Sequence, residues 1–171
     1  MASEGHTLDS VISVKERGKQ EYGRGFYGDA IRLFTQALET GPEDTPLELR
    51  RQLLSNRAQS YLRYGDIYGA RRDTEVALSP QYTLPDSDAS LTAKCLFRHA
   101  KLLYMFARYE EARGEFEKFS ASWRDQGNSS TTDEHQVLAD IERALRAPMG
   151  SKARRKADLM RAVDILILAG Q

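Results

Sequence analysis

The chain repeats one pattern of small and aromatic residues three times, and this self-similarity constrains its fold more than any other feature. A short helix–turn–helix unit cannot bury its apolar face alone, so repeated units stack on one another. Small residues recur where two helices must approach closely. The copies contain Gly18, Gly25, Tyr27, Ala30, Phe34 and Ala37 before Pro42; Ala58, Tyr61, Gly65, Ile67, Ala70, Thr74 and Ala77; and Ala100, Leu103, Ala107, Tyr109, Ala112 and Phe116.

Pairs of alanines indicate helices with one closely packed face. Ala30 and Ala37 are seven residues apart, as are Ala70 and Ala77, and residues at this spacing lie on the same side of a helix. With the small residues at the turns, the pattern resembles the tetratricopeptide repeat (TPR), a helix–turn–helix unit of about 34 residues. The resemblance implies an all-α fold: a right-handed superhelix of three TPR helix pairs, a capping helix and an additional C-terminal helix.

The copies are spaced more widely than one repeat requires. Gly18 and Ala58 are 40 residues apart, and Ala58 and Ala100 are 42 apart, so we expect insertions between repeats of about 34 residues. The proline-containing segments 40–50 and 79–90 suit them. We expect a three-repeat domain with its capping helix over residues 1–147, and a linker and amphipathic helix over 148–171. The expected helices cover residues 10–22, 26–39, 46–64, 67–77, 90–106, 109–124, 132–146 and 152–169.

Composition bounds the function without defining it. The chain has 171 residues with a formal net charge of zero, which argues against nonspecific binding of nucleic acid or membranes as the main task. A single cysteine, Cys95, cannot form an internal disulfide and suits a reducing compartment. No signal peptide or membrane span is recognised in the sequence. We therefore expect a cytoplasmic protein, with the nucleus as the alternative.

The sequence contains no motif in the context that a catalytic site requires. Gly23, Gly25 and Gly28 spell the GxGxxG motif, but that motif binds dinucleotides where it follows a strand, and here a helix is expected before it. His6, His99 and His135 have no spacing typical of metal ligands, and no base is evident near Cys95. We expect no catalytic residue, no metal and no cofactor, and therefore no enzyme.

A set of polar residues on the first helix of each repeat gives the most specific functional prediction. The TPR domains of co-chaperones, such as the Hsp70/Hsp90-organising protein, grip tails ending in Glu-Glu-Val-Asp with a two-carboxylate clamp. The resemblance implies that this chain binds the C-terminal tails of heat-shock protein 90, heat-shock protein 70 or both. Family positions are matched by Lys15, Asn56, Lys94 and Arg98, whereas Lys19 stands where the family has asparagine.

Apolar residues beside these positions are candidates to receive the valine of such a tail. They are Tyr22, Leu53 and Phe97, of which Phe97 suits the core better. Lys19 keeps a hydrogen-bond donor but adds a charge, so it is expected to change affinity or the preferred tail.

The alternative function is a TPR scaffold that assembles with another protein, or with itself, without binding chaperone tails. The expected C-terminal helix bears on this choice because its apolar stripe must be covered. The stripe either packs on the capping helix or docks on a partner, including a second copy in a homodimer. Its members are Leu159, Met160, Val163, Leu166 and Ile167, after a basic cluster of Lys152, Arg154, Arg155 and Lys156.

Overall fold

A computed structural model of the chain describes residues 7–148, 150–152 and 154–160, and all regular secondary structure within them is helical. Every bound of the first seven expected helices is met within two residues, and residues 154–160 are helical inside the eighth. The all-α repeat fold is therefore confirmed. The helices are α1 (Leu8–Gly23), α2 (Tyr27–Thr40), α3 (Leu47–Tyr64), α4 (Ile67–Ala77), α5 (Ala89–Met105), α6 (Tyr109–Asp125) and α7 (Thr132–Leu145).

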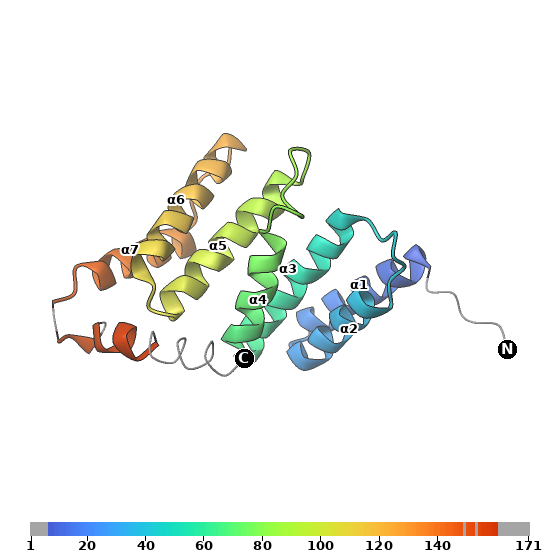
Figure 1. The fold of residues 1–171 in the computed structure, drawn as a ribbon, viewed down its shortest axis with the longest axis horizontal. Coiled ribbons are helices and arrows are strands. Elements are labelled where there is room, and N and C mark those ends of the chain that lie inside the picture. Colours follow the sequence, from blue (N-terminus) through green and yellow to red (C-terminus); the bar gives the residue numbers. More distant parts are fainter. Residues whose placement is uncertain (1–6, 149, 153, 161–171) are drawn as a thin grey trace. The chain divides into compact units, whose positions relative to one another are not determined.

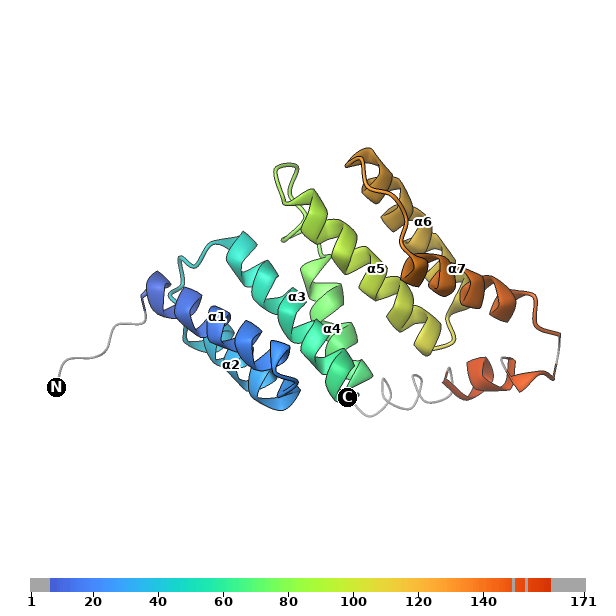
Figure 2. The ribbon, with the colours of Figure 1, turned by 180° about the vertical axis from the view of Figure 1, so that it is seen from behind.

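The chain divides into two compact units within α5, between Cys95 and Leu96. The first unit contains α1 to α4 and the start of α5, and the second contains the rest of α5 together with α6 and α7. In the first unit α1 packs against α2 and α3 against α4, as two successive helix pairs (Figure 1). The first helices of these pairs, α1 and α3, lie side by side (Figure 2).

The small residues of the repeats explain how closely these helices pack. Ala30 and Ala37 of α2 are buried in one core cluster with Phe34 and with Leu53 of α3. Gly18 of α1 faces the ring of Phe34, where an added Cβ atom would lie only 2.6 Å from Cε1. Only glycine fits α1 against α2 at this point without a shift of the ring.

The turns between paired helices use left-handed backbone conformations at the predicted small residues. Gly25 has φ of 85° and Gly65 has φ of 98°, while Ala107 reaches φ of 58° at the third turn. Glycine adopts this region freely, whereas alanine loses about 1 kcal/mol there. Gly25 lies between α1 and α2, so the GxGxxG sequence is part of a repeat turn, as expected, and not a strand-to-helix loop.

A fully buried arginine that the sequence analysis did not anticipate joins α3 to the insertion that follows α4. The side chain of Arg51 is 0% exposed. Its Nε donates to the carbonyl oxygen of Ala77 at 3.0 Å, and its Nη2 donates to Oγ1 of Thr92 at 2.7 Å. One guanidinium thus donates hydrogen bonds to acceptors at the end of α4 and at the start of α5, and it fixes both ends of the insertion between them.

A second arginine crosses three helices of the same unit. Arg57 of α3 donates from Nε and Nη2 to the two carboxylate oxygens of Asp73 at 2.6 and 2.8 Å, and from Nη1 to Thr35 at 2.9 Å. Burial lowers the pKa of Arg57, but the hydrogen bonds and charge of Asp73 outweigh it and raise the pKa overall. This bidentate pair fixes α4 on α3.

The second unit has its own core and a well-capped last helix. Phe97 is half-buried and packs against the buried rings of Phe116 and Phe119 at centroid distances of 6.3 and 5.0 Å, at the edge of the core. Thr131 and Glu134 form a reciprocal capping box at the start of α7, which satisfies two backbone donors of its first turn.

Residues after α7 continue this core. Ala157 is buried in a cluster with Ala107, Tyr109 and Ala144, and Met160 packs on it. Leu159 is 64% exposed, so it does not join Met160 in packing on this cluster. Residues 157 and 160 are three apart and share a helical face, whereas residue 159 is turned away from it. The predicted stripe residues Val163, Leu166 and Ile167 lie outside the described residues.

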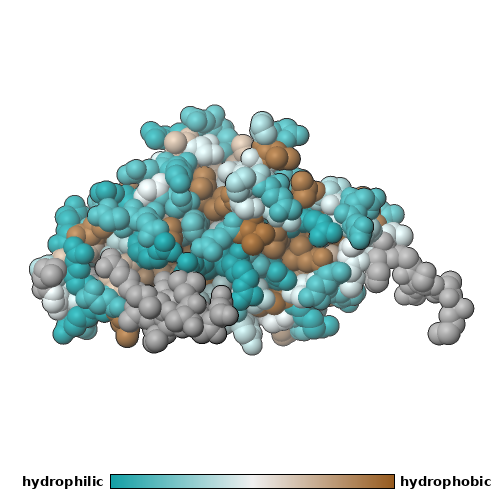
Figure 3. All heavy atoms as spheres, in the orientation of Figure 1, coloured by the Kyte–Doolittle hydropathy of each residue, from teal (hydrophilic) through white to brown (hydrophobic). Residues whose placement is uncertain are grey.

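Two further observations limit the classes of site. Within the part of the chain that the structure describes, no helix has the length and apolar content of a membrane span. The same residues contain no group of three or more histidine, cysteine, aspartate or glutamate side chains that could hold a metal ion. The face drawn in Figure 3 is mainly hydrophilic, with smaller apolar areas between the polar side chains.

Candidate peptide-binding site

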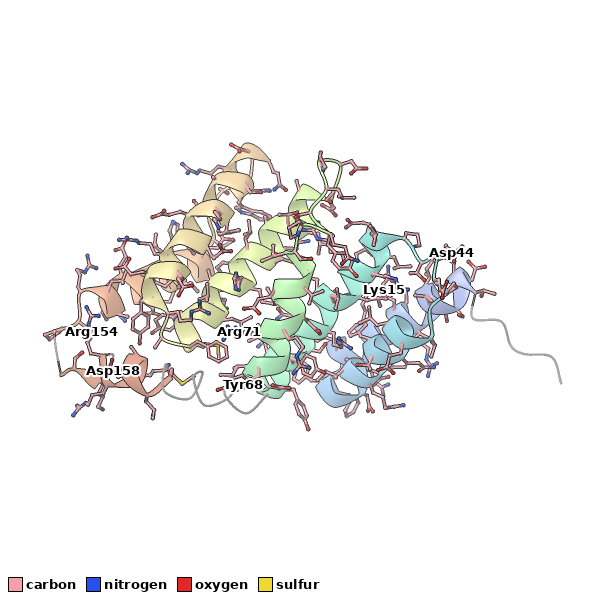
Figure 4. All side chains as sticks on the ribbon, viewed as in Figure 1. Lys15, Asp44, Tyr68, Arg71, Arg154 and Asp158 are labelled. Carbon is pink, nitrogen blue, oxygen red and sulfur yellow. The ribbon has the colours of Figure 1, made fainter. Side chains whose placement is uncertain are left out.

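Lys15 is the best anchored of the candidate residues. It lies on α1 with 15% of its side chain exposed (Figure 4), and its Nζ donates to Oε1 of Gln52 on α3 at 3.0 Å. The nearest carboxylate oxygen, of Glu16, is 3.8 Å away. The closest partner of Lys15 is the neutral side-chain amide of Gln52. Its positive charge can therefore still attract an anionic ligand.

Lys19 lies one turn further along α1 and differs from Lys15 in both exposure and partner. Its side chain is 54% exposed, and its Nζ is 2.8 Å from Oε2 of Glu16. The hydrogen bond from Lys19 is the main cause of a lowered pKa for Glu16, which therefore stays ionised. An exposed pair of this kind contributes no more than about 0.5 kcal/mol, so a ligand carboxylate can replace Glu16 at low cost.

Asn56 and Lys19 meet at a pocket of about 250 Å³ in the first unit. Asn56 comes from α3 and Lys19 from α1, and the other lining residues are Tyr22, Phe34 and Gln59. Among the residues that the structure describes, the side-chain amide of Asn56 has no hydrogen-bond partner. Two candidates that are 37 positions apart in sequence are thus presented to one hollow surface.

Lys94 lies on the first-unit part of α5 and is exposed. The described residues provide no ion pair or hydrogen bond for its amine. The next residue, Cys95, is buried with its Sγ 3.6 Å from Oγ of Ser55. Because Ser55 directly precedes Asn56, this contact holds the backbone at Lys94 close to the backbone at Asn56.

Arg98 is half-buried on the same helix, four residues after Lys94. This spacing places the two cations on one face of α5. Arg98 belongs to the second compact unit, and the pocket at Lys19 and Asn56 is lined by first-unit residues alone. The structure therefore brings Lys19 of α1 and Asn56 of α3 to one pocket, links Lys15 of α1 to Gln52 of α3, and places Lys94 and Arg98 on α5.

The apolar candidates had different outcomes. Tyr22 lines the pocket, whereas Leu53 is 0% exposed and belongs to the core, so its predicted contact with a ligand is wrong.

Two glutamines of the site were missed by the sequence analysis. Gln52 holds Lys15, and Gln59 lines the pocket and donates to the hydroxyl of Tyr22 at 3.2 Å. The signal was present, because these residues lie four before and three after Asn56 and share its helical face.

No protein-family model matches the chain, but its fold is similar to those of solved structures. It is similar to the first TPR domain of Spaghetti (RPAP3), solved bound to the HSP90 peptide SRMEEVD, with 20% identity, a TM-score of 0.63, and coverage of 85% of this chain and 100% of that one. It is also similar to the Sgt2 TPR domain from Aspergillus fumigatus, with 22% identity, a TM-score of 0.61, and coverage of 91% and 99%. The chain therefore has the TPR fold of these co-chaperone domains.

Proposed function

We propose that the chain is a protein-interaction module, and not an enzyme, that binds the acidic C-terminal tails of heat-shock protein 90 and heat-shock protein 70. One observation carries the proposal: Lys19 and Asn56 converge on one pocket, beside Lys15. The fold is shared with a TPR domain solved with an HSP90 peptide ending in Glu-Val-Asp.

Each candidate residue has a distinct part in the proposed two-carboxylate clamp. Lys15, Lys19 and Asn56 donate to the terminal carboxylate of the tail, because their donors gather on α1 and α3. Lys94 and Arg98 receive the side chain of the last aspartate from their shared face of α5. A hydrogen bond to a charged group contributes about 1.5–3 kcal/mol, so the loss of one donor lowers affinity by about tenfold or more.

Calorimetric titration tests this function with the SRMEEVD peptide as a free acid and as its C-terminal amide. We expect binding of the acid only, because amidation removes the terminal charge. Asn56→Ala and Arg98→Ala should each weaken binding by about tenfold or more. Arg32→Ala is the matched control, because Arg32 is 72% exposed on α2 and pairs with Asp29 outside the pocket. Equal affinity for the acid and the amide refutes the clamp.

The exposure of Leu159 favours a second candidate function, self-assembly through the C-terminal segment. Its side chain is 64% exposed in the helix that places Ala157 in the second-unit core. A second copy that covers this side chain would make the chain a homodimeric scaffold. Light scattering after size exclusion should then give twice the mass of 19.3 kDa, and Leu159→Glu should restore the monomer mass.

We also propose that this binding takes place in the cytoplasm, with the nucleus as the alternative, since the sequence has one cysteine, Cys95, which cannot form an internal disulfide and suits a reducing compartment. Fractionation of cells that express the tagged chain tests this localisation.

A further inference from the structure

The pocket beside Lys19 has a lining that the proposed clamp does not explain. Its walls include the ring of Phe34, which is 1% exposed, and the ring of Tyr22. Its remaining lining residues, Lys19, Asn56 and Gln59, all carry nitrogen donors. A pocket with aromatic walls and a few converging polar groups is a usual form of ligand site.

The hydrogen bonds around the pocket leave donors of Tyr22, Asn56 and Lys19 available. Gln59 donates from Nε2 to the hydroxyl oxygen of Tyr22 at 3.2 Å. Because this oxygen accepts that bond, the hydroxyl hydrogen of Tyr22 remains to be donated elsewhere. The amide nitrogen of Asn56 has no partner within the described residues, and the ammonium of Lys19 uses one of its three hydrogens on Glu16.

The charge of the pocket favours an anionic group. Lys19 brings a positive charge, and none of the five lining residues is acidic. Glu16 contacts Lys19 from the protein surface, and its side chain is 48% exposed. A volume of about 250 Å³ is well above what a single water molecule needs, and it leaves enough space for the side chain of one glutamate.

Geometry identifies which part of a bound tail reaches this pocket. Lys19 and Asn56 belong both to the pocket and to the proposed carboxylate site, so the occupant lies within about one residue of the chain terminus, or roughly 3.5 Å. In the proposed clamp the last side chain turns to Lys94 and Arg98 on α5. The side chain before it is therefore the one that faces the pocket.

We propose that this pocket selects tails with an acidic residue in the penultimate position, and that Lys19 determines this preference. The inference depends on the proposed function, since it assumes that a C-terminal carboxylate binds at Lys15 and Asn56. Lys19 has three hydrogens to donate, so besides the terminal carboxylate it can serve the carboxylate of a penultimate glutamate, which also accepts from the Tyr22 hydroxyl. A penultimate valine offers neither donor a further acceptor. Preferred partners would then carry two successive acidic residues at the C-terminus.

The test compares three peptides by calorimetry: SRMEEVD and two versions in which glutamate or glutamine replaces its valine. We expect the glutamate peptide to bind about five- to tenfold more tightly than the other two, which separates charge from side-chain length. Lys19→Asn should abolish this preference while the valine peptide still binds. Tyr22→Phe should reduce it, because only the hydroxyl is removed. Lys152→Asn is the matched control, because it makes the same change at an exposed position outside the pocket.

The outcomes separate the two proposals. Valine-peptide binding that equals or exceeds glutamate-peptide binding overturns the pocket's preference and leaves the clamp standing. A glutamate preference that persists undiminished in Lys19→Asn overturns the role of Lys19. If none of the three peptides binds, while circular dichroism shows folded protein, the proposed function itself fails and this inference fails with it.

Discussion

Replacement of Gly18 by alanine tests the packing that defines the first repeat. A Cβ atom at this position would lie 2.6, 2.9 and 3.0 Å from Cε1, Cζ and Cδ1 of Phe34. Phe34 is 1% exposed and packs in one cluster with Val11 and Leu53, so a displaced ring must leave this cluster or narrow the pocket that it lines. The methyl group must therefore push α1 away from α2 or force the ring from its position.

Two effects of this substitution oppose each other. Alanine is favoured over glycine inside a helix by about 1 kcal/mol, which would stabilise α1. Overpacking of a well-packed core costs about 1–3 kcal/mol. Three ring atoms lie at or within 3.0 Å, so we place the cost in the upper half of that range. The net prediction is a loss of about 1–2 kcal/mol in the free energy of unfolding.

Urea denaturation followed by helical circular dichroism measures this loss as a lower midpoint with an unchanged slope. Gly23→Ala is the matched control, since Gly23 lies in the same helix and an added Cβ atom meets nothing within 4 Å. The control should leave stability unchanged or raise it by a few tenths of a kcal/mol. If Gly18→Ala is at least as stable as the original protein, the packing argument is wrong.

Two further predictions concern buried polar groups. Arg51→Met should lower the free energy of unfolding by about 3 kcal/mol or more, because the Ala77 carbonyl and Thr92 lose their donor. The control Arg50→Met should lower it by about 1 kcal/mol, measured by the same urea denaturation. Hydrogen bonding from His99 and then Lys118, opposed by burial, lowers the pKa of Glu115 from 4.5 to about 2. The ionised carboxylate of Glu115 thus stabilises the fold above pH 4.5, and this stabilisation is lost as the pH falls towards 2. Glu115→Gln should therefore flatten the measured pH dependence of the free energy of unfolding between these pH values.

The sequence predicted the helices well because their determinants are local. Alanine spacing marks the packed faces, and the residues at Gly25, Gly65 and Ala107 mark turns whose left-handed backbone ends one helix before the next begins. Each of these signals acts within about two helical turns of chain. Their agreement across three copies fixed the element order before any long-range contact was known.

The role of Arg51 could not be predicted in this way. Arg50 and Arg51 are adjacent on α3, yet Arg51 is fully buried while Arg50 is partly exposed. The partners that make burial favourable, Ala77 and Thr92, lie 26 and 41 residues further along the chain. Burial of a cation depends on acceptors that only the folded chain assembles, and no local pattern distinguishes such an arginine from a solvated neighbour.

The candidate site shows an intermediate case. Lys15 and Lys19 share a face of α1 at a spacing of four residues. The neighbouring sequence does not distinguish the roles of the two lysines. The folded chain separates their roles: Gln52 of α3 holds the amine of Lys15, and Glu16 holds that of Lys19. Only the resemblance to co-chaperone TPR domains identified Asn56 as a member of the same site, because Asn56 lies in the second repeat and the two lysines lie in the first.

Within the proposed clamp, these different partners predict that Lys15 contributes to affinity and Lys19 to selectivity. A neutral amide fixes Lys15 with 15% of its side chain exposed, so its charge is less screened by solvent and is available to any tail carboxylate. Lys19 is exposed and already paired, so an incoming anion must exchange one ion pair for another. Such an exchange yields little unless the ligand supplies further contacts, and the Tyr22 hydroxyl beside Lys19 offers one to an acidic side chain. If the proposed clamp holds, the departure at Lys19 should therefore favour discrimination between tails more than it strengthens binding to all of them.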